Sequence, residues 1–139
     1  MKWFYSQFPR QRDVYKRQFL YDNLGRIKIV ITKIDGQSYI YKYEYNAIGK
    51  LSRIEHPSGI SLIYYYNDQF YLYKIENSAS NTPIWEAVNV DEKNRITEEK
   101  YGNGVTTYYQ YDSQENLYSI LAVKDETVIQ ELYLSLIHI

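Results

Sequence analysis

Apolar and polar residues alternate along most of the chain, and polar turn residues interrupt the alternation at regular intervals. Segments 39–45 and 60–66 carry a large apolar side chain at every second position. A period of two is typical of a β-strand. The pattern predicts about ten strands of six to nine residues, joined by tight turns, and no helix. The expected fold class is therefore all-β, built from antiparallel hairpins.

Five segments repeat one short pattern. An apolar anchor residue is followed by Asp or Asn, and an aliphatic residue stands six positions after the anchor. Successive anchors are 24, 21, 24 and 21 residues apart. The anchors are Tyr21, Tyr45, Tyr66, Val90 and Tyr111; Asp22, Asn46, Asn67, Asp91 and Asp112 follow them; the aliphatic column is Ile27, Leu51, Leu72, Ile96 and Leu117. We interpret residues 19–133 as five repeats of one hairpin unit.

The turn after each anchor has a physical explanation. Asp or Asn opens a turn because its side chain accepts a hydrogen bond from a nearby backbone amide. Gly25 and Gly49 stand three residues later and supply the positive φ that closes a bulged hairpin. Asn94 can adopt this conformation at a greater cost. Phe70 and Glu115 occupy the same column, so their turns are expected to be strained or differently shaped.

One feature conflicts with simple alternation. Ile54, Ile75 and Ile120 lie three residues after the aliphatic column, which places them on the opposite face of their strands. Either a β-bulge intervenes, or both faces of the sheet are partly covered.

The pattern Tyr-Asp-x-x-Gly-Arg-Leu/Ile, followed by a turn and a Thr- and Tyr-rich strand, resembles the RHS or YD repeat. Segments 21–27 and 101–112 match it most closely. This family includes bacterial RHS repeat proteins, teneurin-like YD shells and shell components of toxin complexes. The resemblance implies that the hairpins form part of a spiralling β-sheet shell. Its repeat-defining structural residues here are Tyr21, Asp22, Gly25, Arg26, Tyr45, Asn46, Gly49, Tyr66, Asn67, Asp91, Tyr111 and Asp112.

The resemblance also implies a function. It indicates a structural segment of a shell that encapsulates a toxin or effector domain in a large secreted or cell-surface bacterial protein. The alternative is a teneurin-like adhesion or carbohydrate-binding region, with glycans on the tyrosine rows. The implied partners are neighbouring repeats of the same polypeptide, an enclosed toxin domain and a glycan. The chain lacks the family's motif for self-cleavage before the toxin, so the resemblance assigns neither a protease nor a toxin to it.

The composition of the chain limits the functions that it can be expected to have. The 139 residues have a formal net charge of −1, which argues against nucleic-acid binding, and they include 18 tyrosines but no cysteine. No apolar stretch approaches the roughly 20 residues of a membrane-spanning helix, so no membrane insertion is expected. The chain has no phosphate-binding loop and no metal-ligand spacing. We therefore expect no enzyme activity, no catalytic or metal site and no cofactor.

Two candidate groups have ordinary structural interpretations. His56 precedes Pro57, which predicts a solvated turn residue. Glu98 and Glu99, beside Lys100, predict an exposed strand edge rather than an acid pair.

The two ends of the chain have a separate interpretation from the repeats. RQRDVYKRQ near the start and LSLIHI at the end resemble peptides translated from sequencing-adapter DNA. We expect residues 1–18 and 134–139 to be such non-native segments. A pair of repeats would also fit one four-stranded propeller blade, which is one alternative architecture.

Overall fold

The computed structural model describes residues 16–134, and these form eleven β-strands and no helix. The strands are β1 (Lys16–Tyr21), β2 (Ile27–Ile34), β3 (Gln37–Tyr45), β4 (Leu51–Glu55), β5 (Ser61–Tyr66), β6 (Leu72–Asn77), β7 (Thr82–Val90), β8 (Ile96–Tyr101), β9 (Val105–Tyr111), β10 (Leu117–Lys124) and β11 (Thr127–Tyr133). The all-β class is confirmed. Within the described part of the chain, no helix is long and apolar enough to cross a membrane.

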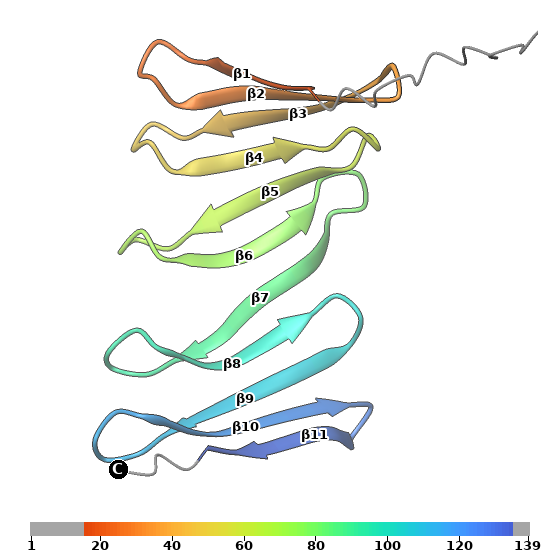
Figure 1. Ribbon diagram of the computed structural model, residues 1–139. Coiled ribbons are helices and arrows are strands. Elements are labelled where there is room, and N and C mark those ends of the chain that lie inside the picture. Colours follow the sequence, from red (N-terminus) through yellow and green to blue (C-terminus); the bar gives the residue numbers. More distant parts are fainter. Residues whose placement is uncertain (1–15, 135–139) are drawn as a thin grey trace, which may run out of the picture.

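The strands form one antiparallel sheet in sequence order, from β1 to β11. Each connection is a hairpin. Figure 1 shows the turns β1–β2, β3–β4, β5–β6, β7–β8 and β9–β10 at one end of the sheet, on the left, and the other turns at the opposite end. The described residues form a single eleven-stranded sheet, so the alternative of four-stranded propeller blades is wrong.

Cross-strand register gives the two faces of the sheet different characters. Directly opposed residues in antiparallel strands project to the same side. One face, which we call the aromatic face, carries the paired rows Phe19, Val30 and Tyr41; Tyr43, Ile54 and Leu62; Tyr64, Ile75 and Trp85; and Tyr109, Ile120 and Leu132. The other face carries charged pairs in its central strands. Lys42 lies opposite Glu55 there, and their side chains form an ion pair of 2.9 Å.

The sheet is a single layer without an enclosed core. Among the apolar residues of 16–134, only Val30 and Ala122 are buried. The side chains of β1 and β11, the two edge strands, are exposed along their whole length. Burial therefore comes from neighbours within the sheet, because no second layer of residues 16–134 covers either face.

The first strand begins three residues before the expected repeat boundary at residue 19. Lys16, Arg17 and Gln18 pair with β2 as a regular part of the ladder. Most of the two end segments, residues 1–15 and 135–139, lies outside the described residues.

Candidate functional site

The five turns that follow the anchors share one hydrogen-bond pattern, and we call them the anchor turns. In the first, the Asp22 amide donates to the Arg26 carbonyl at 2.8 Å, and the Gly25 amide donates to the Asp22 carbonyl at 3.0 Å. The Asp22 carboxylate accepts the amides of Leu24 and Arg26, each at 2.9 Å. Equivalent backbone and side-chain bonds recur in the turns that open at Asn46, Asn67, Asp91 and Asp112. In all five turns the Asp or Asn side chain accepts a backbone amide, as its chemistry predicted.

The residue that closes each anchor turn has a left-handed backbone. Gly25 and Gly49 have φ angles of 77° and 84°, which confirms the conformation predicted for them. Asn94, Phe70 and Glu115 adopt it too, at 60°, 65° and 71°. The Phe70 amide still donates to the Asn67 carbonyl at 2.8 Å, so its turn keeps the common shape. Of the two outcomes expected for Phe70 and Glu115, a different turn shape is wrong, and the structure shows strained backbone instead.

A β-bulge beside each anchor turn resolves the parity conflict. In the second repeat, Glu44 pairs with Arg53 and Tyr45 pairs with Leu51, so Ser52 is the extra residue. The same shift occurs beside the other four anchor turns. The extra residue reverses the alternation, which places Ile54 and its equivalents on the aromatic face.

A tyrosine hydroxyl bridges successive repeats at three places. At each of these places the anchor tyrosine donates to the carbonyl of the aliphatic residue in the preceding repeat, and we call this contact the tyrosine bridge. The bridges run from Tyr45 to Ile27 (2.8 Å), from Tyr66 to Leu51 (2.8 Å) and from Tyr111 to Ile96 (3.2 Å). Backbone pairing between β2 and β3 stops at Ile29 and Lys42. The tyrosine therefore joins the strands where the backbone ladder no longer does.

A cation supports each bridging ring. The Arg26 guanidinium lies 4.4 Å from the centre of the Tyr45 ring, and Lys50 and Arg95 lie 5.4 and 4.0 Å from the rings of Tyr66 and Tyr111. Such cation–π contacts are attractive because the ring face is electronegative.

The turn carboxylate orients the cation in two of these repeats. Arg26 Nε donates to Asp22 Oδ2 at 2.7 Å, and Arg95 donates to Asp91 in the same way. The backbone amide of Arg26 and then its guanidinium hold the pKa of Asp22 below its ordinary value. The Asp–Arg pair of one repeat thus positions the tyrosine of the next. The sequence pattern recorded these residue types, but it did not reveal that they contact one another across repeats.

Anchors without a bridge are exposed. Tyr21 has no preceding repeat in the described chain, and it is 58% exposed. Val90 has no hydroxyl and is 51% exposed. Tyr133 also ends its strand, but it is not an anchor. It pairs with Ser119 while its neighbour Leu132 pairs with Ile120, so Tyr133 lies on the face opposite the anchors.

Glu99 is the centre of a second cluster, on the aromatic face. Its carboxylate accepts hydrogen bonds from Trp85 Nε1 at 2.7 Å, from the Tyr101 hydroxyl at 2.6 Å and from the Tyr109 hydroxyl at 2.5 Å. These residues come from β7, β8 and β9, so the carboxylate ties three strands together. β8 is an interior strand and Glu99 is only 6% exposed. The expectation of an exposed strand edge is therefore wrong for Glu99.

The electrostatics of this cluster favour an ionised carboxylate. Burial raises the pKa of Glu99, but the hydrogen bonds from Tyr101, Tyr109 and Trp85 together lower it below its ordinary value. The pKa of Tyr109 is raised, first by burial and then by its bond to Glu99. A carboxylate with three donors and little exposure is a structural tie, because its oxygens already have partners.

The repeat geometry agrees with the comparison against known families. The teneurin YD-shell family model matches residues 7–114. The chain belongs to this family. Comparison with solved structures gives the same fold: TcdB2-TccC3-Cdc42 and TcdB2-TccC3 each align with a TM-score of 0.68, at 16% and 15% sequence identity. Each alignment covers 81% of this chain and 7% of the solved chain. No curated protein matches the sequence.

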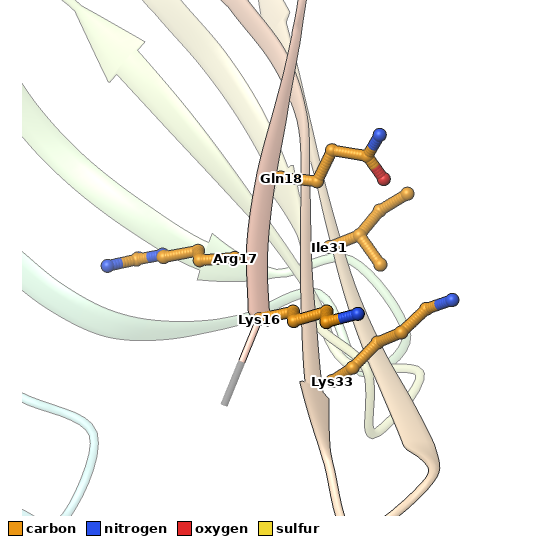
Figure 2. A pocket seen from close by; sticks show the side chains of 5 residues that line it. All are labelled: Lys16, Arg17, Gln18, Ile31 and Lys33. Carbon is orange, nitrogen blue, oxygen red and sulfur yellow. The ribbon is translucent and has the colours of Figure 1, made fainter. Parts of the chain in front are cut away.

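The YD-shell chain also has shallow hollows, and Figure 2 shows one at the first edge strand. Its volume is about 350 Å³, and Lys16, Arg17, Gln18, Ile31 and Lys33 line it. Arg17 points to the opposite side of the sheet from the other four side chains. These residues form an open surface on an edge strand.

The remaining chemistry of the described chain is limited. Residues 16–134 contain no group of three or more His, Asp or Glu side chains that could hold a metal ion. His56 opens a turn, as expected, but it is half-buried, and its ring packs edge-on against Tyr41 at 5.2 Å.

Proposed function

We propose that this chain is a structural segment of a YD shell that encloses a toxin or effector domain within a large secreted or cell-surface bacterial protein. The observation that carries the proposal is the bridge between repeats. At three of the four junctions between the five repeats, a cation of one repeat supports the tyrosine of the next, and that tyrosine bonds back to the first repeat. An arrangement of this kind extends by adding repeats, as in other repeat proteins.

The exposed surfaces support the same proposal. Among residues 16–134, the edge strands β1 and β11 each pair on one side only, which leaves backbone groups suited to continued strand pairing. The aromatic face has no covering layer among residues 16–134. A sheet that continues and curves into a shell would give both features a partner. This chain spans 7% of the solved chains that it resembles. The role of the whole protein is therefore part of our proposal.

The test requires the whole protein. We would extend the reading frame on both sides of the coding sequence, express the entire product and image it by electron microscopy. The expected result is a hollow shell with internal density for a second domain, which resists protease until the shell is opened. A product with an open sheet, or one whose other domains are digested at once, would contradict the proposal.

A matched variant links that result to this segment. Replacing Tyr45, Tyr66 and Tyr111 by Val removes the three tyrosine bridges, and it should speed digestion of the enclosed domain. Replacing Tyr21, Tyr118 and Tyr133 by Val changes three tyrosines that form no such bridge, and it should change the digestion rate much less.

Glycan binding is a second candidate, and one hollow favours it. Tyr39, Tyr41 and His56 border a space of about 350 Å³ together with Gln37 and Ser58. Aromatic rings beside polar groups suit the stacking and hydrogen bonding of a sugar. A glycan array with the full chain tests this candidate. It predicts binding that Tyr41→Ala abolishes and that Tyr108→Ala, on the opposite face, retains.

A further inference from the structure

The junction between β6 and β7 lacks the residues that fill the equivalent junctions. Val90 occupies the anchor position there, and Tyr71 occupies the position of the supporting cation. Backbone pairing between the two strands stops at Lys74 and Glu86. Figure 1 shows β6 and β7 diverging from each other toward the anchor turns. Among residues 16–134, this junction therefore has neither the anchor tyrosine nor the supporting cation of the bridged junctions.

A hollow of about 230 Å³ lies at this junction. Its lining includes Val90, Tyr71 and Leu72, which correspond by repeat position to Tyr45, Arg26 and Ile27 of the β2–β3 junction. Asn67 and Ala87 also line it. The hollow thus lies where a tyrosine ring lies in the bridged junctions. Its volume exceeds the about 150 Å³ that suffices for a benzene molecule in an apolar cavity.

We propose that this hollow binds the phenol ring of a tyrosine presented by another polypeptide segment. Three junctions of the same sheet show the binding geometry. A phenol hydroxyl donates to the carbonyl of the aliphatic column at 2.8 to 3.2 Å while a cation of the preceding repeat lies over its ring. The Leu72 carbonyl is the corresponding acceptor. The incoming tyrosine completes a contact that the repeat leaves out.

The lining favours a neutral aromatic ring. In the bridged junctions a cation lies against the ring, whereas here Tyr71 offers the edge or face of an aromatic ring. Aromatic pairs prefer offset or edge-to-face contact. The other lining groups are a second aromatic ring, the apolar side chains and two amide side chains: Tyr73, Leu72, Ala87, Val88, Val90, Ile96, Asn67 and Asn94. A carboxylate or ammonium group would lose water here without gaining an opposite charge.

The occupant in the assembled protein rests on the proposed function. A shell that encloses a polypeptide holds many side chains close to its wall at high effective concentration. A single open hollow binds one ring weakly, with a Kd on the order of millimolar, because a small ligand gains little binding energy per atom. Such a site is suited to holding a segment that is already enclosed.

The test uses the full 139-residue chain with p-cresol as the probe, followed by methyl and amide NMR. We expect saturable shifts at Leu72 and Val90. 4-Methylanisole has the same ring without the hydroxyl donor, and its affinity should be about five-fold lower. N-acetyltyrosinamide should compete for the same site, which establishes that a tyrosyl side chain is accepted. Shifts spread evenly over the aromatic face would overturn the proposal.

Variants provide the controls. Val90→Tyr and Val90→Phe fill the hollow from within, and each should weaken p-cresol binding at least ten-fold. Tyr111→Val should open a second, similar site between β8 and β9. Unchanged binding in both Val90 variants would overturn the proposal.

The outcome is separable from that of the proposed function. Sedimentation during the titration tests whether a tyrosine of a second copy of the chain occupies the hollow. If p-cresol converts a dimer to monomers, the occupant is a second copy, and the proposal of a different polypeptide segment is overturned. If the whole protein forms no shell but p-cresol still binds, the result supports the hollow as a binding site and contradicts only its occupation by an enclosed polypeptide. If the shell forms and p-cresol does not bind, this inference fails alone.

Discussion

The β2–β3 and β6–β7 junctions end at the same repeat position, but they differ in their side chains and in register, because β7 carries an additional shift between Ala87 and Asn89. In both, strand pairing stops two residues after the aliphatic column, at Ile29 in one and at Lys74 in the other. A tyrosine bridge and a cation close the first junction, while the second remains open as a hollow. The bulges and anchor turns therefore set the course of the strands. The anchor column determines how well successive repeats are joined.

The strand that lacks a bridge on one side is tied on its other side. β7 contributes Trp85 to the Glu99 cluster, which connects it to β8 and β9. Within the described part of the chain this cluster occurs in one repeat, so it is an addition to the repeat pattern. Two kinds of connection thus coexist: a recurring one at the anchor turns and a local one around a buried carboxylate.

Removal of the Glu99 carboxylate should have the largest effect. Glu99→Ala leaves three donors on or near the aromatic face without their acceptor, and it should lower the free energy of unfolding by about 3 kcal/mol. Urea denaturation of the full chain, followed by tryptophan fluorescence, measures the change. Glu98→Ala is the control, because Glu98 accepts one bond, from Asn89, and it should cost about 1 kcal/mol or less. Equal losses in the two variants would show that the cluster is not a special tie.

Conversion of a bridged junction into an open one should have the next largest effect. Tyr111→Val removes a hydroxyl bond, a cation–π contact and part of a packed ring, at a cost of about 2 kcal/mol. Tyr21→Val makes the same change at an exposed anchor without a bridge, and it should cost less than about 0.5 kcal/mol. The same denaturation experiment compares them. Similar losses at both positions would mean that the bridge contributes nothing beyond residue type.

The reverse change at the open junction should stabilise the sheet. Val90→Tyr supplies the missing ring and hydroxyl, and it should raise the free energy of unfolding by about 1 kcal/mol. The gain is smaller than the loss at Tyr111 because no cation awaits the ring at position 71. If the stabilisation depends on a hydrogen bond from the new hydroxyl to the Leu72 carbonyl, it should be smaller in Val90→Phe, which lacks the hydroxyl. A loss of stability in both variants would indicate that the hollow cannot accept a ring.

Relief of the strained closing residue Phe70 should have a smaller effect. Phe70→Gly relieves a left-handed φ of 65°, and it should raise the free energy of unfolding by about 0.5 kcal/mol after the added flexibility of glycine is offset. Gly49→Val places a β-branched residue at φ 84° and should destabilise by roughly 1–3 kcal/mol. Thermal unfolding of the two variants gives the signs. Effects of the same sign would contradict a shared left-handed requirement.

Local chemistry made the turns predictable from sequence. Asp or Asn followed three residues later by Gly defines a turn without knowledge of the rest of the fold, and Gly25 and Gly49 adopt the conformation expected from this pattern. The sequence left two explanations for the position of Ile54, and the β-bulge is one of them. The spacing of apolar residues shows that the alternation breaks, but it does not show which backbone feature breaks it. Phe70 shows the limit of residue preference: the bonds of the turn keep its shape despite an unfavourable residue.

The contacts between repeats were not predictable in the same way. Glu99 gains its partners from residues 85, 101 and 109, and only the register of three strands brings them together. The pairing of Arg26 with Tyr45 likewise spans two strands and a turn. A single sequence records the residue types in each column but not which columns meet in space.

Acid should separate two classes of anchor turn, with the smallest effect. Asp22, Asp91 and Asp112 each have a pKa below the ordinary value, primarily because backbone amides donate to their carboxylates. A lowered pKa in the folded state means that the carboxylate contributes stability above its unfolded pKa and loses it as the pH falls through the folded pKa. Asn46 and Asn67 hold the same turn position and do not titrate in this range.

We therefore expect little change in the anchor turns between pH 7 and about pH 5 and selective loosening of the three Asp turns below about pH 4. Amide hydrogen exchange at each turn is the measurement, after correction for the intrinsic pH dependence of exchange. The amides of Arg26, Arg95 and Asn116 should lose protection before those of Lys50 and Tyr71, whose acceptors are amide oxygens. Asp91→Asn should move the Arg95 amide into the acid-insensitive class, although it also removes the ion pair to Arg95. Simultaneous loss of protection at all five turns would instead show that acid unfolds the sheet as one unit, through a group such as Glu99 that the anchor turns do not share.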